Sequence, residues 1–368
     1  MNFDLTEDEE MLKAMAERFV ADHYDADRRR AFLAEPCGFS EANWTLLGQL
    51  GLTAALLGGP GLDLGATATA TLFEALGRGL VVEPLIENVV LAARLFAATA
   101  PAGLRDAWID GLAAGSRRIA LAHAEPQSRG GRLWVETTAT RTGDGILISG
   151  EKSCVPAGAG ADGYIVSARH SGAPADAGGL ALWLVPADAE GLATRVWRMA
   201  DGGLAVSLRL EAVKLPAAFE LAGGAGAIAS AEIDAGLARA AETLGIMERM
   251  QAETLDYLRT REQFGARLAS FQAIQHRMVA QYAMLEQARA LLNLAIVSEG
   301  APGFARAVRG LRAFLGAAAL PFAHEMVQFH GGMGITNELP ISHGHKRLLV
   351  LSRWPEDPDA ALDAYAEG

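Results

Sequence analysis

Residues 328–334 read Gln-Phe-His-Gly-Gly-Met-Gly, and Glu338-Leu339-Pro340 begins four positions after this stretch. Gly331, Gly332 and Gly334 carry no side chain, which lets the backbone approach a ligand closely. Glycine directly after a helical run is also the common way to end a helix in a left-handed conformation. The pattern predicts a helix that ends just before the two adjacent glycines, followed by a tight turn.

A second stretch, residues 261–265, reads Arg-Glu-Gln-Phe-Gly. Arg261 offers a rigid fork of donors that suits a pyrophosphate, and Phe264 offers an apolar wall for an adenine or a ribose. Gln272 and Gln328 can add polar hydrogen bonds.

Each stretch alone also has a plain structural interpretation. Arg261 could form a surface ion pair with Glu262 or Asp256, and Gly331-Gly332 could be an ordinary helix C-cap. The functional interpretation depends on both stretches occurring together in one domain order.

The order of helical and strand segments follows from the residues on the N-terminal and C-terminal sides of these stretches. From Ile228 almost to the C-terminus the apolar residues follow a helical period, and so do those from Leu5 to about Gly115, where five or six helices are expected. Between them lie short, β-branched segments punctuated by turns, which predict an antiparallel sheet. The expected strands are residues 119–125, 134–140, 145–150, 164–170, 180–185, 194–197 and 205–213. Helices, then sheet, then helices is an informative order, because it differs from the alternating pattern of α/β proteins.

The composition limits the possible partners. The chain has 368 residues, 51% of them hydrophobic, and a formal net charge of -12. Acidic residues spread along such a chain argue against nucleic acid or an anionic membrane surface as a partner. Cys37 and Cys154 do not make a disulfide framework or a zinc-ligand pattern. No signal-peptide pattern or apolar run of about 18 residues is present, so the expected location is the cytoplasm.

The two stretches and the domain order resemble the acyl-CoA dehydrogenase family. The family pattern is R-x-x-F-G, then F/H-Q, then Q-x-x-G-G-x-G followed by E-x-P, and residues 261–265, 271–272, 328–334 and 338–340 match it. The resemblance in domain order covers the whole chain. It implies an α+β fold with an N-terminal helical domain (residues 1–116), a central antiparallel β-barrel domain (117–222) and a C-terminal four-helix bundle (223–368).

The resemblance also implies FAD as cofactor and an acyl-CoA thioester as substrate. In the family, the matching C-terminal residues reach across a subunit interface and hold the ADP half of a flavin whose ring lies in the neighbouring subunit. The residues expected to contact FAD are therefore Arg261, Phe264, Gln272, Gln328, Gly331 and Gly332.

The central domain departs from the family pattern. The family's T-E-P-G-A-G-S-D loop is Ala124-Glu125-Pro126-Gln127-Ser128-Arg129-Gly130-Gly131 here, and its K-x-W-I-T-N strand is Lys152-Ser153-Cys154-Val155-Pro156-Ala157. Cys154 stands where the family has a tryptophan wall. Pro156 stands where it has a hydroxyl donor, and proline has no N–H to offer. The contacts to the flavin ring are therefore expected to be missing or rebuilt.

The catalytic base is also displaced. The reaction needs a carboxylate that removes a proton α to the thioester, and the family's usual glutamate position falls on Pro355. Glu356 is one residue later and is the expected base if the loop shifts by one position, whereas a solvated pair with Asp357 is the alternative interpretation. The second base position known in the family falls on Ala235, beside Asp234.

Within the family, residues 328–347 most resemble the small subunits of paired dehydrogenases, including those for pimeloyl-CoA and for steroid side-chain CoA thioesters. This implies an FAD-dependent acyl-CoA dehydrogenase subunit, a homo-oligomer or an α2β2 assembly with a homologous subunit, and an electron-transfer flavoprotein as electron acceptor. Two alternatives stay open. The chain could be a catalytically silent partner that completes the active site of a large subunit, or a flavin monooxygenase, which needs no carboxylate base.

Overall fold

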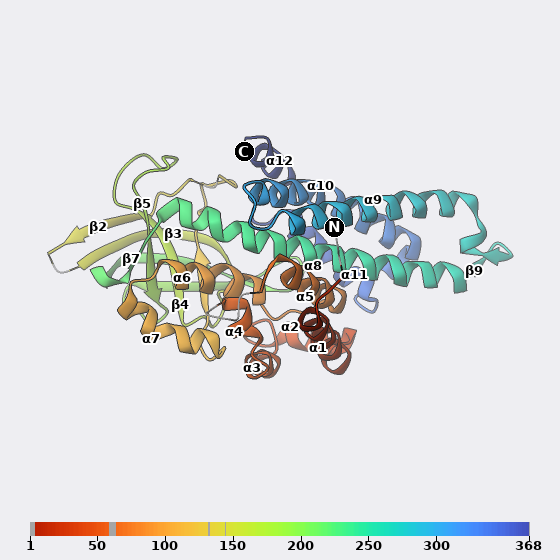
Figure 1. Cartoon of the computed structure of the whole chain (residues 1–368), viewed down its shortest axis with the longest axis horizontal. Coiled ribbons are helices and arrows are strands. Elements are labelled where there is room, and N and C mark those ends of the chain that lie inside the picture. Colours follow the sequence, from red (N-terminus) through yellow and green to blue (C-terminus); the bar gives the residue numbers. More distant parts are fainter. Residues whose placement is uncertain (1–3, 59–63, 132, 144, 368) are drawn as a thin grey trace. The chain divides into compact units, whose positions relative to one another are not determined.

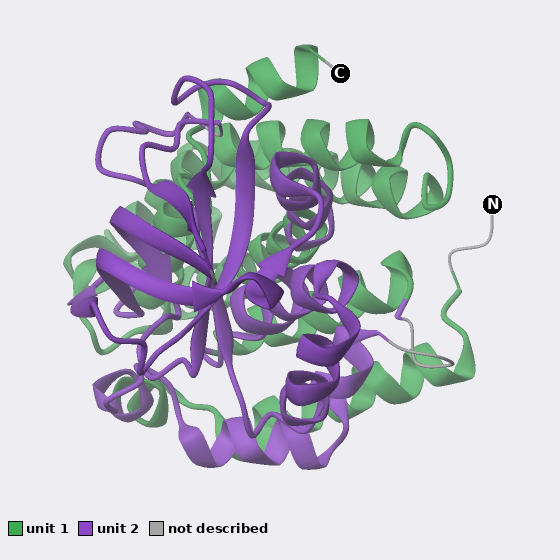
Figure 2. Ribbon diagram, turned by 90° about the vertical axis from the view of Figure 1, so that its left-hand side faces the viewer, with its two compact units in different colours: residues 1–30, 65–81, 236–368 green, residues 31–64, 82–235 purple. Residues whose placement is uncertain are grey.

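The computed structural model describes residues 4–58, 64–131, 133–143 and 145–367. These residues form two compact units, coloured separately in Figure 2. Unit 1 consists of Met1–Arg30, Gly65–Val81 and Gly236–Gly368, and unit 2 of Ala31–Leu64 and Val82–Ala235. Within the described residues, no helix is long and apolar enough to cross a membrane.

Unit 1 is helical apart from a small hairpin. Its longest helices run along the upper and middle part of Figure 1, and the hairpin lies at the ends of α8 and α9. The elements are α1 (Glu7–His23), α5 (Ala66–Gly79), α8 (Gly224–Thr260, which begins in unit 2), β9 (Glu262–Gln263), β10 (Ala266–Arg267), the 3-10 turn η3 (Leu268–Ser270), α9 (Gln272–Val297), α10 (Phe304–His330), the 3-10 turn η4 (Gly331–Ile335), α11 (Pro340–Leu351) and α12 (Pro358–Ala366). Helix α2 (Ala26–Ala34) divides between the units.

Helices α5 and α8 cross closely because glycines lie at the contact. A Cβ on Gly245 of α8 would clash with the carbonyl oxygen of Glu74 on α5, and a Cβ on Gly77 would clash with that of Glu242. Arg78 of α5 then pairs with Glu248 of α8 at 2.6 Å. The close backbone approach is what brings these charged side chains within reach.

Replacing Gly245 by Ala is expected to lower the free energy of unfolding by about 1–3 kcal/mol, since the added methyl group forces two packed helices apart. The control is Gly226→Ala in the same helix, where a Cβ would meet nothing within 4 Å. That change is expected to be neutral or to stabilise by up to about 1 kcal/mol. Urea denaturation of both variants checks the prediction, and equal stabilities would contradict it.

Unit 2 contains short helices and the sheet. Its helices are α3 (Glu41–Gln49), α4 (Leu52–Leu57), the π-helix η1 (Leu85–Ala93), α6 (Arg94–Thr99), α7 (Ala102–Ala113) and the 3-10 turn η2 (Ala217–Phe219). Its strands are β1 (Ile119–Ala122), β2 (Thr138–Thr142), β3 (Gly145–Pro156), β4 (Gly163–Arg169), β5 (Leu180–Pro186), β6 (Leu192–Arg198), β7 (Leu204–Pro216) and β8 (Glu220–Leu221). The predicted succession of helices, sheet and helices is confirmed. The described N-terminal part has more helices than the five or six expected, because α4 is very short and α6 continues η1 without a break.

The strands form one sheet in the order β6-β7-β3-β2-β4-β5-β8, with β1 paired to β4. Most neighbours are antiparallel, but β1 is parallel to β4, and β2 is also paired in parallel with β4 through Thr138 and Arg169, so the prediction of a purely antiparallel sheet is wrong at these two places. A long connection between the strands of each parallel pair permits this arrangement, whereas a hairpin would not. Among the described strands no pairing joins β6 to β8, and a closed barrel is therefore not shown.

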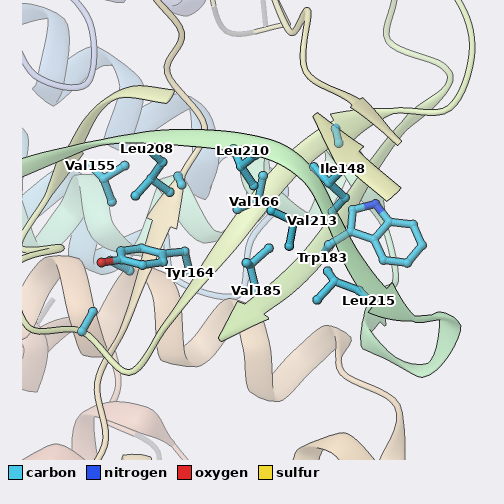
Figure 3. Packing of buried hydrophobic residues seen from close by; sticks show 14 of the residues in the cluster. Ile148, Val155, Tyr164, Val166, Trp183, Val185, Leu208, Leu210, Val213 and Leu215 are labelled. Carbon is cyan, nitrogen blue, oxygen red and sulfur yellow. The ribbon is translucent and has the colours of Figure 1, made fainter. Parts of the chain in front are cut away.

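The core of unit 2 lies against this sheet. Figure 3 shows the apolar side chains of β3, β4, β5 and β7 that meet there, among them Val166, Trp183 and Val213. Each of these three side chains is at most 1% exposed. Buried strands with this composition form a rigid platform for the polar groups described below.

Candidate functional site

All six residues predicted to contact the cofactor are exposed and lie in unit 1. Three come from the hairpin and the start of α9, and three from the end of α10 and the turn after it. The ring of Tyr257 in α8 stacks on that of His330 in α10 at 4.5 Å, and Arg277 of α9 covers the ring of Phe329 at 5.0 Å. These contacts bring the two groups to the same end of the helices. The residues concerned are Arg261, Phe264, Gln272, Gln328, Gly331 and Gly332.

Phe264 lies at the tip of the hairpin and is 91% exposed. It has φ 58° and the following Gly265 has φ 77°. Positive φ at both central residues matches a type I′ turn, where Asn and Gly are preferred. A phenylalanine there is strained and exposed, so local folding does not explain it, and such strain is typical of functional sites.

The turn after α10 presents bare backbone to solvent. Gly331 has φ 59° and ψ -142°, a conformation that is essentially restricted to glycine. A Cβ added at Gly331 or Gly332 would meet no atom within 4 Å. Internal packing therefore does not require glycine at these positions. The backbone conformation requires it at Gly331, whereas at Gly332 a ligand or a second chain that touches the backbone would.

The segment that follows the turn is anchored by cations. Arg30 donates to the carbonyl oxygen of Asn337 at 2.7 Å, and Lys346 donates to the side-chain oxygen of the same residue at 2.7 Å. Arg29 donates to Nδ1 of His343 at 3.0 Å, and Nε2 of this ring lies 3.1 Å from the Asn337 carbonyl oxygen. The ring therefore carries its proton on Nε2 and is neutral in this arrangement.

His343 is predicted to make stability fall in mild acid. Burial and the nearby Arg29 lower the pKa of His343 below its ordinary 6.5, against the raising effect of its bond to Asn337, while Lys346 and Arg30 lower it further. The unfolded chain therefore binds a proton below about pH 6.5 that the folded chain resists, and stability is lost as the pH falls through this window. Unfolding free energies at about pH 7.5 and pH 5.5 are expected to differ less in His343→Gln than in the wild type. Equal pH dependence in both proteins would contradict this.

Glu356, the predicted base, is buried rather than solvated, with 7% of its surface exposed. Its neighbour Asp357 is exposed and caps α12 by accepting a hydrogen bond from Ala360 N–H. The alternative of a solvated acidic pair is therefore wrong for Glu356. The loop before it docks on α10, where Arg312 donates to the Trp354 carbonyl oxygen at 2.8 Å.

The structure does not bring Glu356 together with the six cofactor residues. Arg312, on which its loop docks, lies about 24 Å along α10 from Gln328, at 1.5 Å per residue. The second base position holds Ala235, which is fully buried. The adjacent Asp234 pairs with Arg94 at 3.5 Å.

Unit 2 contains a buried ion pair that sequence patterns did not predict. Lys152 Nζ lies 2.6 Å from Glu125 Oε1 and is fully buried. Glu125 also accepts hydrogen bonds from Thr137 N–H and Oγ1 and from Glu136 N–H. Burial lowers the pKa of Lys152 to about 8 against the raising effect of Glu125. Burial opposes ionisation of Glu125 too, but Lys152 and the hydrogen bonds outweigh it and lower the pKa of Glu125.

The remaining donors of Lys152 extend the network. It donates to Ser167 Oγ at 3.0 Å and to the His123 carbonyl oxygen at 3.4 Å, and Ser167 Oγ lies 2.8 Å from His123 Nδ1. Both charged residues belong to stretches that sequence analysis selected, but nothing in their spacing indicates that the two side chains meet.

Cys154 is a protonated thiol. Burial and the nearby carboxylate of Glu87 raise the pKa of Cys154 to about 12. A thiol with this pKa is a poor nucleophile at neutral pH, so Cys154 behaves as a small apolar side chain rather than as a nucleophile.

Three family models match the chain over nearly its whole length. They are Acyl-CoA dehydrogenase, N-terminal domain (residues 6–116), middle domain (120–209) and C-terminal domain (218–354). Acyl-CoA dehydrogenase FadE27 of Mycobacterium tuberculosis is 28% identical over 96% of this chain and 94% of its own length.

Solved structures of paired proteins are similar as well. A variant of the Tcur3481-Tcur3483 steroid ACAD is 30% identical, with a TM-score of 0.86 over 98% of this chain and 97% of that chain. The ChsE4-ChsE5 complex from Mycobacterium tuberculosis is 25% identical, with a TM-score of 0.88 over 100% of this chain and 98% of that chain.

Proposed function

The chain belongs to the acyl-CoA dehydrogenase family of oxidoreductases, and we propose that it takes part in the α,β-dehydrogenation of an acyl-CoA thioester as an FAD-binding subunit. The proposal rests on the six exposed residues at one end of the helices of unit 1. A guanidinium, an aromatic ring at positive φ and a bare glycine backbone are exposed there, and the ring has only an edge contact with Phe271. These are the groups that a dinucleotide needs.

The residues of unit 1 fit the ADP half of FAD. Arg261 would donate to the pyrophosphate, Phe264 would cover the adenine or the ribose, and Gln272 and Gln328 would add polar contacts. The backbone of Gly331-Gly332 leaves room for the ligand to approach. When bound, FAD supplies the acceptor for the substrate hydride.

Two residues of unit 2 differ from those with which the family contacts the flavin ring. Cys154 provides a thiol in place of an aromatic wall, and Pro156 provides neither an N–H nor a hydroxyl. We therefore propose that the active assembly pairs this chain with a homologous subunit in an α2β2 arrangement rather than as a homo-oligomer. The pair names Tcur3481-Tcur3483 and ChsE4-ChsE5 of similar structures support this, and a steroid CoA thioester is then a substrate to test.

We also propose that the domain borders lie near residues 116 and 222. The sheet is then part of a β-barrel, and the C-terminal helices form a four-helix bundle. The ranges of the three family models support these borders. An electron-transfer flavoprotein is the proposed acceptor of the reducing equivalents, and the cytoplasm is the proposed location.

Cofactor binding by the purified protein tests the proposal. Arg261→Ala is expected to weaken FAD binding by about 10- to 100-fold, because a charge-assisted hydrogen bond is lost. Phe264→Asn is expected to weaken it as well while leaving stability unchanged or raised, since Asn suits a type I′ turn. Arg259→Ala is the control, because Arg259 is also exposed and lies 3.7 Å from Asp256. Fluorescence titration with FAD gives the affinities, and equal values for all four proteins would contradict the assignment.

Activity of the chain alone tests the silent-partner alternative. If the purified chain holds stoichiometric FAD and reduces a dye with an acyl-CoA, the silent-partner alternative is wrong. If it does so only after a homologous subunit is added, the chain supplies one half of a shared site.

A further inference from the structure

Two histidines lie side by side between α10 and α11 of unit 1. His324 belongs to α10 and is exposed, and His345 belongs to α11 and is partly buried. The centroids of the two rings are 5.1 Å apart, and the ring planes are inclined by 34°. Neither residue is one of the six predicted cofactor contacts.

The nitrogens of both rings are available to a ligand. Among the residues that the structure describes, neither side chain forms a hydrogen bond or an ion pair. Burial, the neighbouring ring of His324 and the ammonium of Lys346 lower the pKa of His345 below its ordinary 6.5. The ring of His345 is therefore neutral at pH 7, and a neutral imidazole is the form that binds a metal ion.

The separation of the rings suits one shared ion. Two imidazoles that bind the same ion through nitrogens at about 2.0–2.1 Å, with about 90–110° between the two bonds, have centroids about 4.5–5.2 Å apart. The observed 5.1 Å lies within this range. In the part of the chain that the structure describes, no third His, Cys, Asp or Glu joins the pair, so the remaining ligands of such an ion are water molecules.

The charges around the pair determine the class of ion. The charged groups that act on His345 are His324 and Lys346, and the Lys346 ammonium donates to Asn337 Oδ1 at 2.7 Å. Hard cations such as Mg²⁺ and Ca²⁺ need oxygen ligands, above all carboxylates. Two imidazoles without a carboxylate favour ions that bond strongly to nitrogen, which are Cu²⁺, Ni²⁺ and Zn²⁺.

We propose that His324 and His345 form a binding site for a divalent transition-metal ion, which joins α10 to α11. Residues 331–339, which include the glycine turn, connect these two helices. A bound ion therefore restrains the turn by tying together the helices on both sides of it. The inference goes beyond the proposed function and does not depend on it, because it rests on the geometry of the two rings.

Isothermal titration calorimetry with nickel chloride tests the site on the full chain without a histidine tag. The wild type is expected to bind one ion per chain. His324→Gln and His345→Gln are each expected to weaken binding by about 10- to 100-fold, because one ring alone lacks the effect of two linked ligands. His276→Gln removes an exposed histidine of α9 and is the control, which is expected to bind like the wild type.

Two further measurements identify the ligands and the class of ion. Electron paramagnetic resonance of bound Cu²⁺ is expected to show two nitrogen ligands in the wild type and fewer in each single variant. Affinity is expected to be higher for Cu²⁺ than for Ni²⁺, and no binding is expected with magnesium chloride. Equal nickel affinities of the wild type and both single variants, or a Cu²⁺ spectrum with fewer than two nitrogens, overturn the inference. Either result leaves the proposed function untouched.

Discussion

Replacement of Lys152 by Met is expected to lower the free energy of unfolding by about 3–5 kcal/mol. The change removes the cation from the fully buried pair and leaves the carboxylate of Glu125 without its counter-charge. Glu125→Gln is expected to destabilise in the same way, because it leaves the ammonium unpaired. Urea denaturation followed by circular dichroism gives the values.

A double variant separates the ion pair from simple loss of packing. Lys152→Met with Glu125→Gln has no buried charge, and the amide oxygen still accepts from Thr137, so it is expected to be more stable than either single variant. Arg18→Ala is the control, since Arg18 pairs with Asp22 at the surface with 85% and 57% of the two side chains exposed. That change is expected to cost less than about 1 kcal/mol. Equal costs for Lys152→Met and Arg18→Ala would contradict the account.

Replacement of Glu356 by Gln is expected to lower the rate of dehydrogenation by about 10²- to 10⁴-fold. Glutamine keeps the size of the side chain but does not take up a proton, so substrate binding is expected to change little. The measurement is dye reduction by the active assembly with a saturating acyl-CoA. It tests the assignment of the base in this chain.

Asp357→Asn is the matched control for this variant. Asn caps a helix about as well as Asp, so α12 is expected to stay intact and the rate to stay unchanged. An unchanged rate in Glu356→Gln would show that the base belongs to another residue or to the partner subunit.

The order of helices and strands was predictable because the period of apolar residues is a local property of the chain. The parallel pairing of β1 with β4 was not predictable, because it depends on a long connection between the strands, which local turn residues do not indicate. The same holds for Lys152 and Glu125, which meet only after strands far apart in sequence have packed. A buried ion pair of this kind produces no periodic pattern in the sequence.

The candidate site was predicted in part. The motifs selected Arg261, Phe264 and the glycine turn, but the positive φ of Phe264 and the exposure of the whole group emerge only in three dimensions. Burial of Glu356 was missed because acidic neighbours in a terminal loop usually face water.

The exposed Phe264 has a consequence for how the protein behaves at different concentrations. Its ring has an edge contact with Phe271, at 6.4 Å between the ring centroids, and is otherwise open. In the proposed assembly, where the cofactor lies between chains, the apparent affinity for FAD is expected to depend on the chain concentration by mass action. Dilution of that proposed assembly is expected to release FAD together with the partner subunit, and an excess of one subunit is expected to limit how much flavin the mixture retains. A balanced supply of the two proposed subunits would then determine the amount of active enzyme.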